Sequence, residues 1–112
     1  MLKHLLTIAG SDSSGGAGIQ ADLKTFAAHG TFGMSVITAV TAQNTCGVTM
    51  VQEITPEVVG AQIAAVFDDI RVAAVKIGML SRPETIRAIA ASLRKYQPKI
   101  IVLDPVMISK SG

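Results

Sequence analysis

The sequence predicts an α/β fold in which a parallel central sheet carries helices on both faces. Short, nearly continuous apolar runs alternate with longer stretches whose apolar residues recur at helical spacing, a pattern typical of parallel α/β proteins. The runs are also rich in Val and Ile, as expected of strands covered on both faces. They occupy residues 5–9, 35–42, 73–77 and 100–103. We expect all four to be central strands of one sheet.

Three helices are expected between these strands. The first is predicted to end at Gly30, and the second to begin after Thr55, which is followed by Pro56. Ser81 is expected to cap the third, with Glu84 in its first turn. The apolar faces comprise Ile19, Leu23, Phe26 and Ala27 in the first helix, Val59, Ile63, Val66, Phe67 and Ile70 in the second, and Ile86, Ile89, Ala90 and Leu93 in the third.

One further segment, residues 47–54, alternates loosely and follows a polar turn. It is expected to form a short extra strand or a flap. The whole chain of 112 residues has the length of one domain and is short for a complete two-substrate enzyme. We therefore expect a single domain.

Composition excludes several classes of protein. The net charge is +2, no Trp is present, and Tyr and Phe total four residues, so neither a basic surface nor an aromatic platform for nucleic acid is indicated. No run approaches the roughly 20 apolar residues that span a bilayer. Cys46 is the only cysteine, which excludes an internal disulfide. The expectation is a cytoplasmic protein with no nucleic-acid or membrane partner.

Polar residues follow each predicted strand, at the edge where ligands bind in doubly wound sheets. Gly10 opens a loop over residues 10–18 that is rich in Gly and Ser and leads into a helix whose free N–H groups can face polar or anionic atoms. The loop matches neither standard nucleotide motif, because its glycine spacing differs and no Gly-Lys-Ser/Thr follows. It indicates a ligand cradle or simply a flexible connection.

Three side chains near this edge are candidates for contact with a ligand. Asp22 falls on the apolar stripe of the first helix, where it is either a structural acid or an acceptor for a ligand hydroxyl or amine. Gln43 ends the second run, where its amide could read the edge of a heterocycle. Asp104 ends the fourth run and either caps the next turn or holds Mg²⁺ or a water near phosphates. Cys46 is expected to be a loop residue rather than a nucleophile.

Several blocks in this order resemble one family. Residues 9–26 (AGSDSSGGAGIQADLKTF) resemble the opening signature of the bacterial hydroxymethylpyrimidine/phosphomethylpyrimidine kinases. Later blocks of the same family resemble residues 41–45 (TAQNT), 76–80 (KIGML), 104–107 (DPVM) and 110–112 (KSG). The resemblance implies a ribokinase-like fold and the use of ATP and Mg²⁺. The implied reaction phosphorylates 4-amino-5-hydroxymethyl-2-methylpyrimidine and its monophosphate in thiamine biosynthesis, in an enzyme that is a homodimer when complete.

The resemblance also assigns residues. It implies that Gly10, Asp22, Gln43, Met79 and Val106 surround the pyrimidine, with Gln43 reading its amino and ring-nitrogen edge. It further implies a phosphate side that comprises Asp104, which would meet Mg²⁺ through water, and Lys110. The segment over residues 46–54 would partly cover the substrate.

One departure from the family concerns its C-terminal half. The Gly-rich anion hole and the catalytic acid or cysteine lie there in this superfamily, so the resemblance puts the catalytic residue beyond Gly112 and assigns none within residues 1–112. We expect the N-terminal portion of one kinase domain, truncated after about four core strands and inactive alone. A non-catalytic pyrimidine-binding fragment and a pyridoxine/pyridoxal-type vitamin kinase are the alternatives. Gln43 within TAQNT favours the pyrimidine.

Overall fold

The computed structural model describes residues 2–104, and its main element is a four-stranded parallel sheet. The strands are β1 (His4–Ala9), β2 (Phe32–Ile37), β5 (Ala74–Ile77) and β6 (Ile101–Leu103), in the order β2-β1-β5-β6. In this register Leu6 of β1 lies opposite Met34 on one side and Val75 on the other. Because the strands are parallel, their carboxyl ends meet at one edge of the sheet.

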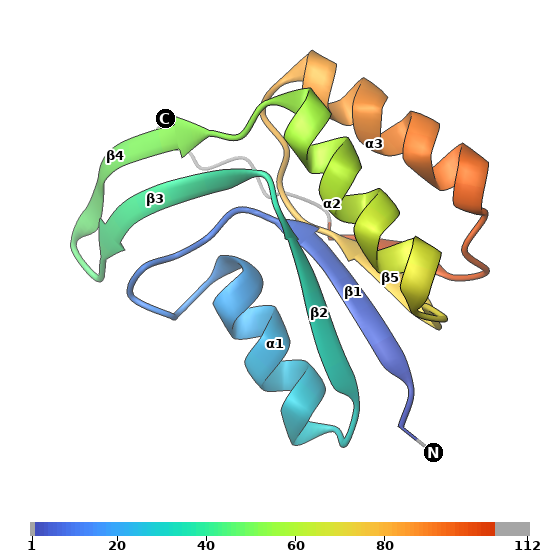
Figure 1. Cartoon of the computed structure of the whole chain (residues 1–112). Coiled ribbons are helices and arrows are strands. Elements are labelled where there is room, and N and C mark those ends of the chain that lie inside the picture. The colour runs from blue at the N-terminus through green and yellow to red at the C-terminus, as the bar shows by residue number, and fades with distance from the viewer. Residues whose placement is uncertain (1, 105–112) are drawn as a thin grey trace.

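Helices cover both faces of the sheet (Figure 1). Helix α1 (Gly18–Ala28) packs against β1 and β2 on one face, while α2 (Pro56–Asp69) and α3 (Pro83–Tyr96) lie together on the other. The predicted fold class is therefore confirmed. None of the helices within residues 2–104 has the length and apolar character needed to cross a membrane.

The main core lies between the sheet and helices α2 and α3. Leu6, Ile8, Val36 and Val75 from the strands are fully buried there against Ile63 and its neighbours on α2. Burial of each such side chain contributes about 1.5–3 kcal/mol. On the opposite face, a Cβ at Gly33 would lie 2.8 Å from Leu23 Cδ2 and 3.0 Å from the Phe26 ring, so this glycine permits close packing of α1.

The prediction of one strand over residues 35–42 is wrong. The chain leaves the parallel sheet at Thr38, and β3 (Ala39–Asn44) then pairs antiparallel with β4 (Gly47–Glu53) in a second sheet. Thr38 links the two sheets, because its N–H donates to Ala9 O and its carbonyl accepts from Ile54 N, both at 3.0 Å. The expected extra strand over residues 47–54 is confirmed as β4.

The prediction that all four runs are central strands is confirmed for β1 and β5 and stays a prediction for the other two runs. Within the part of the chain that the structure describes, β1 and β5 are the inner strands, and β2 and β6 are the outer ones. Since β6 has a neighbour on one side only among residues 2–104, its residues Ile101 and Leu103 are 45% and 68% exposed there.

Two of the three predicted helix boundaries are confirmed. Thr55 caps α2, where its hydroxyl accepts from Val58 N at 3.3 Å, and Gly30 follows α1 with a φ of +74°. Ser81 does not cap α3, because Pro83 at the first helical position favours an extended conformation at Arg82, which becomes the N-cap. The Ser81 hydroxyl instead donates to Glu53 Oε1 at 2.7 Å.

Candidate functional site

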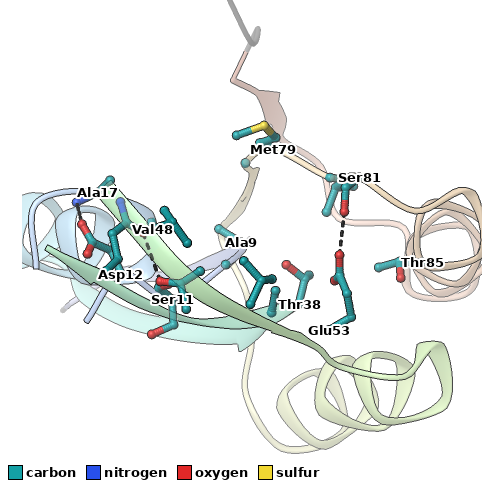
Figure 2. A pocket seen from close by; sticks show the side chains of 18 of the residues that line it. Ala9, Ser11, Asp12, Ala17, Thr38, Val48, Glu53, Met79, Ser81 and Thr85 are labelled. Carbon is teal, nitrogen blue, oxygen red and sulfur yellow. Dashed lines mark hydrogen bonds between the residues drawn. The ribbon is translucent and has the colours of Figure 1, made fainter. Parts of the chain in front are cut away.

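A cavity of about 450 Å³ opens at the carboxyl ends of the parallel strands, against the β3–β4 hairpin. Gly10, Gln43, Met79 and Asp104 all line it, so the structure brings together four of the predicted site residues. Figure 2 shows Ser11, Asp12 and Ala17 toward one end and Glu53, Ser81 and Thr85 toward the other. The expectation that polar residues gather at one edge of the sheet is confirmed, whereas their contacts with a ligand stay a prediction.

The Gly-Ser loop is organised around Asp12, which is only 3% exposed. Its carboxylate accepts from Ser14 N (2.8 Å), Ser14 Oγ (2.7 Å), Gly16 N (3.0 Å) and Ala17 N (2.8 Å). The bond from the Ser14 hydroxyl is the main cause that lowers the pKa of Asp12, with the backbone N–H groups adding to it. Asp12 therefore occupies N–H groups of the loop that precedes α1, whereas a ligand at the N–H groups of the helix itself stays a prediction.

The start of α1 is held close to Gly10. Gly18 has a φ of +58°, and a Cβ there would lie 2.3 Å from Gly10 O. The same carbonyl accepts from Ile19 N at 2.9 Å. The side chain of Gln20 closes the loop further, because it accepts from Asp12 N at 2.8 Å and donates to Ser11 Oγ at 2.9 Å. The loop is thus a defined wall of the cavity rather than a flexible connection.

Asp22 is paired within the protein and does not line the cavity. Thr7 Oγ1 donates to one carboxylate oxygen at 2.6 Å, and Lys76 Nζ lies 2.7 Å from the other. The predicted inward position is confirmed, and its partners account for a charged group that is only 15% exposed. Asp22 is therefore one residue removed from the cavity: it pairs with Lys76, and Lys76 lines the cavity.

Lys76 is a site residue that sequence reasoning missed. It lies on the inner strand β5, and its ammonium group is also 3.6 Å from Asp104 Oδ2. The available signal was its place as the one charged residue in the run over residues 73–77. A lysine there has to reach a counter-charge or solvent, because an unpaired buried charge is costly.

Gln43 lies on the hairpin rather than at the end of a central strand. A bulge separates it from Ala42, and its Oε1 lies 3.0 Å from Thr41 Oγ1. Its backbone is tied to the Gly-Ser loop, because Gln43 N donates to Ser13 Oγ at 2.7 Å and that hydroxyl donates to Gln43 O at 2.6 Å. Loop and hairpin therefore hold this amide at the cavity together.

The α3 end of the cavity contains polar residues that the sequence did not indicate. Glu53 on β4 accepts a hydrogen bond from Ser81, and both residues line the cavity together with Thr85 (Figure 2). Thr85 is 3% exposed, and its hydroxyl has no hydrogen-bond partner among the described residues. A buried orphan hydroxyl is rare in native proteins, and pattern analysis cannot reveal one.

The remaining predicted positions divide into two groups. Val106 and Lys110 lie outside the described residues, so the structure does not test them. Gly112 lies outside them as well, and the expectation that the family's catalytic residue falls beyond Gly112 therefore stays a prediction. Cys46 is exposed in the hairpin turn, in agreement with a loop residue.

The metal site implied by the resemblance rests on a single acid. No cluster of three His, Cys, Asp or Glu residues suited to a metal occurs within residues 2–104. Asp104 nevertheless fits Mg²⁺, which often takes one or two protein carboxylates and completes its shell with water and phosphates. A role for Asp104 toward Mg²⁺ would thus depend on bound phosphates.

Comparison with known proteins identifies the family. The family model for phosphomethylpyrimidine kinase matches residues 12–112. A hydroxymethylpyrimidine/phosphomethylpyrimidine kinase from Rhizobium meliloti is 64% identical over 112 residues, and one from Salmonella typhimurium is 56% identical over 109. These matches cover 100% and 97% of this chain but 42% and 41% of the relatives. The chain therefore spans less than half the length of these curated relatives.

Solved structures agree with this assignment. The crystal structure of phosphomethylpyrimidine kinase from Clostridium difficile superposes with a TM-score of 0.93 at 65% identity, over 98% of this chain and 48% of that one. A Staphylococcus aureus pyridoxal kinase in complex with pyridoxal gives 0.83 at 38% identity, over 96% of this chain and 40% of that one. The chain belongs to the phosphomethylpyrimidine kinase family.

Proposed function

We propose that residues 1–112 form the N-terminal, pyrimidine-binding portion of one kinase domain. The complete enzyme would use ATP to phosphorylate 4-amino-5-hydroxymethyl-2-methylpyrimidine and its monophosphate in thiamine biosynthesis. The observation that carries this proposal is the cavity beside the hairpin, where Gly10, Gln43 and Met79 meet in a chain of this family. In the first phosphorylation, the hydroxymethyl oxygen bonds to the γ-phosphorus of ATP as the bond to ADP breaks, and the hydroxyl proton passes to water. In the second, a phosphate oxygen of the monophosphate bonds to the γ-phosphorus in the same way.

The composition of the cavity suits a small polar heterocycle. Its volume of about 450 Å³ lies within the range of small-molecule sites, about 300–1,000 Å³. Val48, Val51 and Met79 offer apolar surface to a ring, while the Gln43 amide can both donate and accept at the amino and ring-nitrogen edge. Gly10 adds backbone to the same wall. Val106 would complete the pyrimidine side.

The phosphate side is proposed to begin at Asp104. This carboxylate follows β6 and is 61% exposed at the cavity, where it would meet Mg²⁺ through water, with Lys110 nearby on the phosphate side. Bound Mg²⁺ would offset charge on the phosphates. The use of a nucleotide is supported by S. aureus pyridoxal kinase, whose solved structures include complexes with AMP-PCP and with ADP. We further propose a cytoplasmic homodimer for the complete enzyme.

A pyridoxal-type vitamin kinase is the second candidate. The pyridoxal kinase of Bacillus subtilis, solved as an ADP complex, is 44% identical over 98% of this chain, with a TM-score of 0.87. A shared fold does not fix the substrate, which depends on the side chains at the site. The higher identity to the pyrimidine kinases and the Gln43 amide at the cavity favour the pyrimidine.

A chimaera tests the proposal, with residues 1–112 replacing the matching segment of the R. meliloti relative. We expect it to phosphorylate hydroxymethylpyrimidine with ATP, and Gln43→Ala to raise KM for the pyrimidine about tenfold or more, because an amide that forms two hydrogen bonds is lost. Gln52→Ala is the matched control, since Gln52 is an exposed glutamine on the same hairpin and does not line the cavity. Equal effects of the two substitutions would contradict the assignment of Gln43.

The 112-residue chain by itself is expected to show no ATP-dependent phosphorylation. Phosphoryl transfer depends on positioned groups that neutralise the transferring phosphoryl, and the resemblance puts the anion hole in the C-terminal half. Radiolabelled ATP and hydroxymethylpyrimidine provide a sensitive assay. Appreciable turnover by the isolated chain would show that residues 1–112 already contain a working catalytic centre.

A further inference from the structure

Lys76 is a charged residue in the middle of an inner strand. Its neighbours on β5, Val75 and Ile77, are buried in the core on the opposite face. The Lys76 side chain is 24% exposed and lines the cavity. Partial removal of an ammonium group from water is costly unless it is paired, so the contacts of this side chain need an explanation.

Two acids from separate elements meet this one ammonium group. Asp22 comes from the middle of α1 and lies 2.7 Å from Lys76 Nζ, whereas Asp104 follows β6 and lies 3.6 Å from it. The second oxygen of Asp22 accepts from Thr7, the residue opposite Lys76 in the β1–β5 register. Asp104 is also fixed through its backbone, because its N–H donates to Ile77 O at 3.0 Å.

Stability alone does not account for this arrangement. Buried ion pairs often contribute little to stability, since the cost of desolvating both charges offsets their attraction, and apolar replacements are frequently tolerated. Lys76 and Asp104 nevertheless line the cavity, and Asp22 is joined to them by its ion pair with Lys76. The family resemblance implies that Asp22 belongs to the pyrimidine side, and the function proposed above puts Asp104 on the phosphate side. A lysine that contacts both acids joins these two sides.

We propose that Lys76 is a positioning residue that holds Asp22 and Asp104 in fixed relation for phosphoryl transfer to the pyrimidine alcohol. The proposal rests on the proposed function. The Lys76 ammonium donates a hydrogen bond to Asp22 Oδ1 at 2.7 Å and lies at ion-pair distance, 3.6 Å, from Asp104 Oδ2. Without the Lys76 ammonium group, Asp22 would keep only its hydrogen bond from Thr7. Asp104, whose side chain is already 61% exposed, would lose its ion pair.

The test uses the chimaera described above with three variants. Lys76→Met removes the charge while retaining much of the chain length, Lys76→Arg retains the charge, and Asp22→Asn/Lys76→Met removes both members of the closer pair. Each is measured for its urea midpoint and for kcat and KM with hydroxymethylpyrimidine and ATP. Because a displaced reacting group can reduce the rate about 100-fold, we expect a loss of that order in kcat for Lys76→Met, with a smaller change in KM.

The other variants separate positioning from a purely structural role. Lys76→Arg is expected to keep the urea midpoint and at least about a tenth of kcat, since its charge can still pair with both acids. The double variant is expected to regain the midpoint that Lys76→Met loses, because no unpaired buried carboxylate remains, but not to regain kcat. Recovery of both properties in the double variant would overturn the proposal. So would a kcat for Lys76→Met within threefold of the parent value, or equal losses for Lys76→Arg and Lys76→Met.

A parent chimaera that fails to phosphorylate the pyrimidine gives a different result. It would refute the proposed function itself, and the role of Lys76 in that reaction would fall with it. A parent that is active, combined with variants that do not follow the expected order, would refute only the role of Lys76.

Discussion

Substitution of Gly18 by Ala tests how the Gly-Ser loop is held against the cavity. The new Cβ would lie 2.3 Å from the Gly10 carbonyl oxygen and 3.4 Å from Asp12 N, and both neighbours are backbone atoms. Relief of the clash displaces the carbonyl that accepts from Ile19 N at 2.9 Å. The left-handed φ of +58° adds strain for any residue with a side chain.

The magnitude follows from these three contributions. Left-handed backbone costs about 1–2 kcal/mol, overpacking about 1–3 kcal/mol and a lost hydrogen bond about 1 kcal/mol, which together predict about 3–6 kcal/mol of destabilisation. Two other glycines separate the causes. Gly30 has a φ of +74° with open space around it, so Gly30→Ala should cost only the backbone strain. Gly60 lies inside α2 with open space, so Gly60→Ala should stabilise the helix by about 0.5–1 kcal/mol.

Urea unfolding of the chain, followed by far-ultraviolet circular dichroism, measures all three variants against the parent. The predicted order of stability is Gly60→Ala, parent, Gly30→Ala and Gly18→Ala, from highest to lowest. A Gly18→Ala variant within about 1 kcal/mol of Gly30→Ala would refute the close approach of Gly18 to Gly10, because overpacking alone should add that much. That result would also mean that the loop does not form the wall of the cavity as described.

Three further predictions concern stability. The pKa of Asp12 is lower in the folded protein than in the unfolded chain, so its carboxylate stabilises the fold fully above the unfolded-state pKa. This stabilisation is lost as the pH falls below about 4, the ordinary pKa of an aspartate. Urea midpoints measured over that pH range should therefore fall more for the parent than for Asp12→Asn. Thr85→Val should raise the free energy of unfolding by up to about 1–3 kcal/mol in urea titrations, because it removes an unpaired buried hydroxyl; a decrease would indicate a hydrogen-bond partner for Thr85. Ile63→Ala should lower it by about 2–5 kcal/mol, against less than about 0.5 kcal/mol for the half-exposed Val58→Ala on the same helix, and similar losses for both would contradict the core as described.

Much of the architecture could be predicted from the sequence because its signals were local. Thr55 before Pro56 marks a helix start, because the Thr hydroxyl can cap the first turn and Pro is favoured at the first helical position. The apolar spacing from Val59 onward identifies the buried face of α2. The change of sheet at Thr38 could not be predicted. Residues on both sides of it favour strands equally, and the turn depends on hydrogen bonds to Ala9 and Ile54, which are distant in sequence.

The site was predicted in position but not in detail. The apolar stripe of the first helix predicts that Asp22 points inward, but it does not identify the partner of this carboxylate, Lys76, which is 54 residues away along the chain. The sequence indicates only a polar loop around Asp12, whereas the structure shows the Asp12 carboxylate at the centre of that loop. Such roles depend on which donors a tertiary fold directs at one group, and neither spacing nor composition encodes that information.

The central claim is that substrate recognition resides in residues 1–112, and one exchange tests it directly. These residues would replace the matching segment of S. aureus pyridoxal kinase, to which they are 38% identical over 96% of this chain. The measurement is the ratio of kcat/KM for hydroxymethylpyrimidine to kcat/KM for pyridoxal. The account predicts that the ratio shifts toward the pyrimidine by about tenfold or more, and that Gln43→Ala reverses most of the shift. A folded, active exchange protein that retains the ratio of the pyridoxal kinase would contradict it.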